Sequence, residues 1–60
     1  MKQYTIEYGI EDFDGKLISD DRYDYIIYRK NAATAVRTFI ADFYAESKGE
    51  KVRPHIFKVY

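Results

Sequence analysis

The chain contains no cysteine, no tryptophan, a single proline and a single histidine. Without cysteine it has neither a disulfide bond nor a thiolate-held metal, the usual supports of very small domains. This absence favours a reducing compartment. No apolar run approaches the roughly 20 residues that a transmembrane helix needs, and the first residues read as a strand rather than a signal peptide. We therefore expect a cytoplasmic protein that does not associate with a membrane.

Side chains suited to catalysis are equally scarce. His55 is the only histidine, Ser19 and Ser47 are the only serines, and neither serine has the sequence context of a nucleophile elbow. We predict that the protein is not an enzyme, and that His55 lies half in water on an edge strand. The loop around Gly15 resembles part of a calcium loop, but the alignment puts Ile10 where the first acidic ligand belongs. No metal and no cofactor is predicted.

Sixty residues predict one domain spanning residues 1–60. A chain of this length buries only about 60% of its extended surface, so its stability is expected to be marginal. Aromatic residues make up 18% of the chain, with seven tyrosines. Some of these rings fill the core, and others are expected at the surface, where tyrosine serves interfaces.

Charge is balanced overall but unevenly distributed. Ten basic residues face ten acidic ones, which is not the footprint of a general polyanion binder. Residues 1–30 hold seven acids and five bases, whereas residues 31–60 hold three acids and five bases. The acids of the first half cluster around a predicted hairpin: Glu11, Asp12, Asp14, Asp20, Asp21 and Asp24. They form either a solvated turn or a partner-binding surface, for which the candidates are Asp12, Asp14, Asp20 and Asp21.

Two strands are predicted in the first half of the chain. Tyr4, Ile6, Tyr8 and Ile10 alternate with polar residues, the period of a strand with one buried face. A turn at residues 12–15 follows, with Gly15 able to take positive φ. The second strand is clearest at residues 22–29, and residues 17–18 are a possible start for it. Its apolar residues stand at both odd and even positions, so the sequence does not show which face of this strand is buried.

A helix and a last strand complete the pattern. Asn31 is a good N-cap, and Gly49 suits the position that ends a helix, which predicts a helix over residues 32–48. Its buried stripe is expected to comprise Val36, Phe39, Ile40 and Phe43. Pro54 introduces a strand over residues 55–60. The order β-β-α-β predicts an α+β fold of the half ferredoxin-like kind, with the first strand in the centre, the helix on one face and the other face open.

The most localised basic feature lies between the helix and the last strand. It reads Lys51-Val52-Arg53-Pro54 and supplies two cations two residues apart. One interpretation is a solvated loop. The other is a rigid pair of cations that meets carboxylates of a partner, for which the planar fork of Arg53 is well suited.

Two further classes of function compete with protein binding. A single-stranded nucleic-acid binder would use the open sheet face, with a platform of Tyr23, Tyr25 and Tyr60 beside Arg29 and Lys58. A self-associating structural protein would pair through the exposed edge of the last strand. For the oligomeric state, we expect a monomer or a weak dimer.

The chain resembles a family of short phage proteins that inhibit the RNA polymerase of the bacterial host. The similar features are the element order, the strand Tyr23-Asp24-Tyr25-Ile26-Ile27-Tyr28, Ala35 in a capped helix, and the segment Lys51-Val52-Arg53-Pro54, and they are strongest over residues 22–55. The cap here is Asn where the family has Thr, and Lys51 stands where the family has Arg. The resemblance implies that Lys51 and Arg53 engage an acidic surface of the polymerase, so the partner is expected to be a host protein, with RNA polymerase as the candidate.

Overall fold

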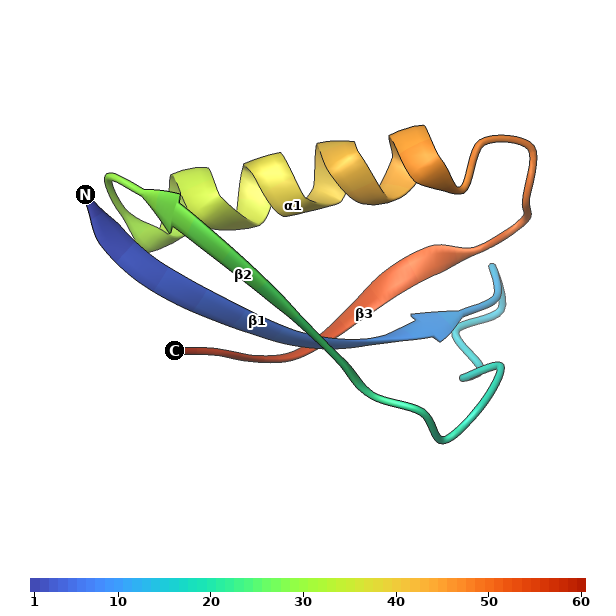
Figure 1. The fold of residues 1–60 in the computed structure, drawn as a ribbon. Coiled ribbons are helices and arrows are strands. Elements are labelled where there is room, and N and C mark those ends of the chain that lie inside the picture. The colour runs from blue at the N-terminus through green and yellow to red at the C-terminus, as the bar shows by residue number, and fades with distance from the viewer.

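A computed structural model describes all 60 residues and contains three strands and one helix. Along the chain these are β1 (Lys2–Glu11), β2 (Tyr23–Arg29), α1 (Ala32–Glu46) and β3 (Arg53–Val59). The strands form one sheet in the order β2-β1-β3, antiparallel at both junctions. Figure 1 shows α1 lying along one face of this sheet. The predicted α+β fold, with β1 in the centre, is confirmed.

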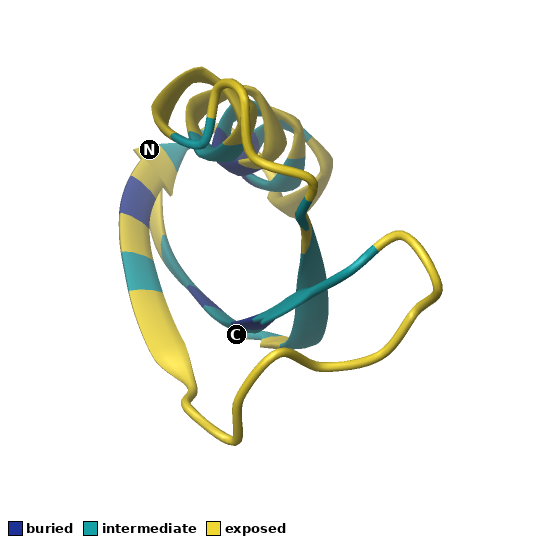
Figure 2. Ribbon diagram, turned by 90° about the vertical axis from the view of Figure 1, so that its right-hand side faces the viewer, coloured by how far each residue is buried: buried dark blue, intermediate teal, exposed yellow.

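The alternation in β1 sets which face of the sheet is buried. Ile6 is completely buried beneath the helix, and Tyr4, Tyr8 and Ile10 lie on the same side of the strand. The opposite side carries Gln3, Thr5 and Glu7, as the period-two pattern predicts. Figure 2 shows buried stretches on the strands and on the side of α1 that faces the sheet.

Pairing with β1 decides the inward face of β2, which its own sequence leaves open. Ile6 lies opposite Tyr25 and Tyr4 opposite Ile27, so these residues of β2 face the helix. Ile26 and Tyr28 face the other way and are 59% and 56% exposed. Leu17 forms only an isolated bridge to Glu11 and does not belong to β2.

The helix begins where predicted and ends two residues earlier. Asn31 is the N-cap, and its side chain accepts a hydrogen bond from the backbone N–H of Thr34. At the other end, the backbone N–H and the hydroxyl of Ser47 both donate to the carbonyl oxygen of Phe43. These bonds close the helix at Glu46, and Gly49 then turns the chain with φ at +88°.

The buried stripe of α1 is rotated from the one predicted. Ala35 and Phe39 are the buried residues of the helix, and Val36 and Phe43 are half-buried. Ile40 is 37% exposed and lies at the margin, so its inclusion in the buried stripe was wrong. The small side chain of Ala35 lets the first turns of the helix approach the sheet closely, and the ring of Phe39 then fills the centre of the core.

Strand β3 starts at Arg53, two residues before the predicted start, and Pro54 lies within it. Pro54 is tolerated there because β3 is an edge strand that pairs only with β1. A register shift opposite Glu7 and Tyr8 brings the ring of Phe57 over Gly9. The backbone of Tyr60 continues the pairing through reciprocal hydrogen bonds with Thr5.

The sheet face away from α1 is called the open sheet face here, and it includes Gln3, Thr5, Glu7, Ile26, Tyr28, Lys58 and Tyr60. No helix covers it (Figures 1 and 2). The helix α1 is too short and too polar to span a membrane.

Candidate functional site

The predicted cation pair lies at one end of the sheet, where the segment after α1 enters β3 (Figure 1). Arg53 is the first residue of β3, and its Nε lies 3.9 Å from a carboxylate oxygen of Glu11. Its Nη2 donates a long hydrogen bond of 3.4 Å to the carbonyl oxygen of Phe13. The Arg53 side chain remains 44% exposed, whereas that of Glu11 is only 13% exposed. Lys51 is exposed in the preceding loop and forms no ion pair.

Glu11 also organises the neighbouring histidine. His55 Nδ1 lies 3.5 Å from the second carboxylate oxygen of Glu11, and its ring packs on Phe57 with centroids 4.7 Å apart. The His55 side chain is 43% exposed on the edge strand β3, as predicted from the sequence. Glu11 is therefore the anchor of the basic end of β3.

The acidic residues follow the same end of β1 into the predicted turn at residues 12–15, where the backbone N–H of Asp12 donates to the carbonyl oxygen of Lys16, and then into a loop that runs to β2. Asp12 has a local structural role, because its Oδ1 accepts hydrogen bonds from the backbone N–H groups of Asp14 and Lys16. Gly15 closes this turn with φ at +83°. Asp14, Asp20 and Asp21 are exposed on the loop. The contact of Arg53 with the carbonyl oxygen of Phe13 brings this acidic loop next to the cation pair.

The tyrosine platform predicted for nucleic acid does not form as described. Tyr23 and Tyr25 face the helix side, where Tyr23 packs on Tyr8 and Tyr25 packs on Phe39. Arg29 is also on the helix side, since its Nε donates to the Thr38 hydroxyl of α1. Only Tyr60 and Lys58 of that set lie on the open sheet face, with the Lys58 ammonium 4.7 Å from the Tyr60 ring centroid.

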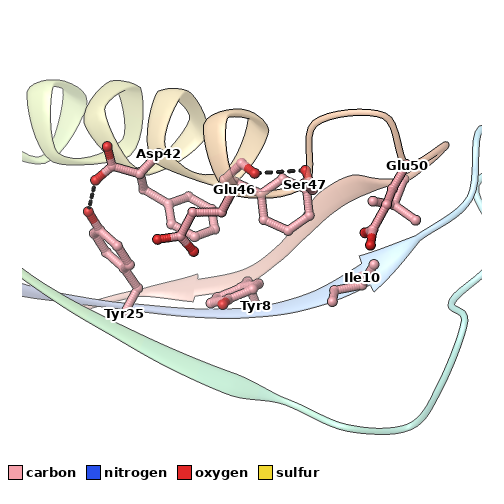
Figure 3. Close-up of a pocket in the computed structure, with 10 residues that line it drawn as sticks. Tyr8, Ile10, Tyr25, Asp42, Glu46, Ser47 and Glu50 are labelled. Carbon is pink, nitrogen blue, oxygen red and sulfur yellow. Dashed lines mark hydrogen bonds between the residues drawn. The ribbon is translucent and has the colours of Figure 1, made fainter.

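A pocket that sequence reasoning missed lies on the helix side, between the C-terminal half of α1 and the sheet (Figure 3). Its volume is about 200 Å³. The walls are aromatic and apolar residues together with three carboxylates and a serine: Tyr8, Ile10, Tyr25, Phe39, Phe43, Val52, Asp42, Glu46, Glu50 and Ser47. The signal available in the sequence is the spacing of the acids, because Asp42, Glu46 and Glu50 follow one another at four-residue intervals.

Two tyrosine hydroxyls in this pocket are held in their neutral form. Tyr25 donates a hydrogen bond to the carboxylate of Asp42, and this bond, reinforced by burial, raises the pKa of Tyr25 to about 12. Burial also raises the pKa of Tyr8, with a further contribution from the negative charge of Glu46. The Tyr25 hydroxyl therefore stays protonated as a hydrogen-bond donor to Asp42 over the physiological pH range.

The hydroxyls of both serines are engaged in local hydrogen bonds. Ser19 accepts from the backbone N–H of Asp21, and Ser47 donates to Phe43 at the end of the helix. No three histidine or carboxylate side chains are grouped closely enough to hold a metal ion. What the structure brings together is a cation pair beside an acidic loop at one end of the sheet, and an acidic aromatic pocket under the helix. No protein-family profile matches the chain, and no match to a curated protein or a solved structure was found.

Proposed function

We propose that the protein is a small, non-enzymatic, protein-binding module, encoded by a phage, that inhibits a host protein. The candidate target is the bacterial RNA polymerase, which the resemblance of residues 22–55 suggests. The observation that carries the proposal is that Glu11 holds the guanidinium of Arg53, two residues after the exposed, unpaired ammonium of Lys51. Such a surface is suited to carboxylates of a partner.

The contacts of Arg53 favour binding because they hold the side chain in place before a partner arrives. The nearly buried Glu11 carboxylate and the carbonyl oxygen of Phe13 orient the guanidinium from one side. A guanidinium has five N–H donors, so its exposed side can still form a bidentate pair with a carboxylate. Immobilising a long side chain on binding costs about 0.5–1.5 kcal/mol, and this cost is reduced for a side chain that is already oriented.

This end of the molecule carries both negative charge, from the acidic loop, and positive charge, from Lys51 and Arg53. Asp14, Asp20 and Asp21 are exposed on this loop, and Asp14 follows Phe13, whose carbonyl oxygen contacts Arg53. A partner with an acidic patch next to a basic one would be oriented uniquely by such a surface, since complementary charge governs orientation and association rate. The same aspartates would repel nucleic acid bound to the target.

Binding to purified bacterial RNA polymerase, together with affinity capture from a bacterial lysate, tests the proposal. The Lys51→Ala/Arg53→Ala variant should lose most of the captured polymerase. The matched control is Lys2→Ala/Lys30→Ala, which removes the same charge from exposed residues at the other end of the sheet. Absence of polymerase from the wild-type eluate, or an equal loss with both variants, would show that the assignment is wrong.

A second candidate, binding of single-stranded nucleic acid, is favoured by the open sheet face. Tyr28 and Tyr60 are 56% and 55% exposed there, and Lys58 lies against the Tyr60 ring. Exposed rings beside a cation can stack bases. A titration of labelled oligonucleotides at low salt tests this function, and an unchanged fluorescence anisotropy would eliminate it.

A further inference from the structure

The acidic residues of the pocket account for all the acid in the second half of the chain. Residues 31–60 contain three acidic residues, and Asp42, Glu46 and Glu50 all line this one cavity. None of them forms an ion pair with a lysine or arginine, although the chain has ten basic residues. The pocket is therefore a concentration of uncompensated negative charge in a chain of zero net charge.

Asp42 and Glu46 lie at an electrostatically unfavourable end of the helix, although Asp42 also accepts the hydrogen bond of Tyr25. Glu46 is the last residue of α1 and Asp42 lies one turn before it, at the end of the helix where the macrodipole is negative. No basic residue in the last turn compensates them. Asp42 and Glu46 also repel each other as a like-charged pair four residues apart, which costs about 0.2–0.5 kcal/mol. A cationic ligand bound between these carboxylates would relieve this repulsion.

The walls and floor of the pocket narrow the class of cation. Tyr8, Tyr25 and Phe43 surround the ring of Phe39, with centroid distances to Phe39 of 4.7, 5.1 and 6.2 Å. Figure 3 shows the carboxylates of Glu46 and Glu50 directed from the helix side toward Tyr8 and Ile10 of β1. Because the carboxylates are not grouped closely enough to hold a metal ion, the geometry favours an organic cation whose apolar part lies on the rings.

We propose that this pocket receives an arginine side chain of a partner protein. A guanidinium stacks on aromatic rings with its plane and pairs with carboxylates through its edge, so the two kinds of wall match its two kinds of surface. Its three-methylene stem would lie along Ile10 and Val52. Charge complementarity and a cavity of about 200 Å³ thus select a single inserted side chain.

This site is distinct from the cation pair of the proposed function. Val52 lines the pocket on the helix side of the sheet, whereas Arg53 pairs with Glu11 on the other side. Substitutions in the pocket therefore leave Lys51 and Arg53 in place. The two surfaces can be tested separately.

The test is an NMR titration of the ¹⁵N-labelled protein with a blocked peptide that carries one arginine among glycines. We expect saturable shifts of the backbone amides of Tyr8, Phe43, Glu46 and Val52 at millimolar peptide. The same peptide with citrulline, which has the shape of arginine but no charge, should leave these amides unshifted. Absence of shifts with the arginine peptide, or equal shifts with citrulline, would overturn the proposal.

Variants that remove charge from the pocket or from another surface test whether the arginine peptide binds in the pocket. Glu46→Gln/Glu50→Gln should weaken the arginine peptide about three- to tenfold, the range expected from two partly exposed ion pairs. The matched control Glu7→Gln/Asp24→Asn removes two charges from the open sheet face and should leave the affinity unchanged. Well-dispersed spectra of both variants establish that they are folded. Equal weakening by the control would show that only overall charge matters, and the pocket would not be the site.

Discussion

Replacing Phe39 by alanine is expected to unfold the protein at room temperature. Phe39 is 1% exposed and is one of only two large side chains that are fully buried, the other being Ile6. Its ring contacts those of Tyr8, Tyr25 and Phe43, so truncation would open a cavity bounded by aromatic side chains that cannot easily collapse.

The expected magnitude exceeds what so small a fold can lose. Truncating a buried phenylalanine costs about 3–5 kcal/mol. At roughly 0.05–0.15 kcal/mol per residue, a chain of this length has only about 3–9 kcal/mol of stability in total. A chain that buries little of its surface belongs near the lower limit. Near that lower limit of about 3 kcal/mol, the truncation removes all of the free energy of unfolding.

Urea denaturation followed by circular dichroism at 222 nm measures this loss. The control is Ile40→Ala on the adjacent residue, which is 37% exposed and should cost only about 1–2 kcal/mol. With an m-value of about 1 kcal/mol/M, the control should keep a clear folded baseline while Phe39→Ala has none. Equal urea midpoints for the two variants would refute a core centred on Phe39.

Three further predictions concern a close contact, a titrating hydroxyl and a helix cap. Gly9→Ala would place a Cβ 3.0 Å from the Phe57 ring and should cost about 1–3 kcal/mol, measured by urea midpoint; Phe57→Leu in the same chain should restore much of the loss. Because its pKa is raised to about 12 in the folded state from an ordinary 10.0, Tyr25 should contribute stability that is full below pH 10 and is lost as the pH rises toward 12. The Tyr25→Phe variant, which cannot bond Asp42, should lose less stability over that interval, and an equal loss would contradict the assignment. Asn31→Ala should lower the free energy of unfolding by about 1 kcal/mol, whereas Asn31→Ser should be nearly neutral in the same thermal melt.

The features that could be predicted from the sequence are those with a local physical cause. The alternation of Tyr4, Ile6 and Tyr8 defined the buried face of β1, because each side chain of a strand points opposite to the next. Asn31 and Gly49 marked the limits of the helix, because caps act through bonds and dihedral angles of adjacent residues. The segment Lys51-Val52-Arg53 stands out as a short motif because its two cations are close in sequence, and its role in binding a partner stays a prediction.

The features that could not be predicted depend on contacts between elements. The sequence of β2 is apolar on both faces, and only its pairing with β1 turns Tyr25 inward and Ile26 outward. The rotation of the helix exposes Ile40 because Ala35, rather than Ile40, is the residue that packs closely on the sheet. The pocket also depends on contacts between elements, because its walls come from β1, β2, α1 and the segment after α1.

The position of β1 in the centre of the sheet has a consequence for the order of folding. Its two neighbours come from opposite halves of the chain, and the last residue, Tyr60, pairs with Thr5. A hairpin of β1 and β2 can form early, but the sheet reaches its full width only when residues 53–60 have been synthesised and have crossed back to the start. Contacts so distant along the chain slow folding. A growing chain on the ribosome would therefore hold an unpaired edge of β1 until residues 53–60 have emerged, and during that interval it would be most open to chaperones and to aggregation.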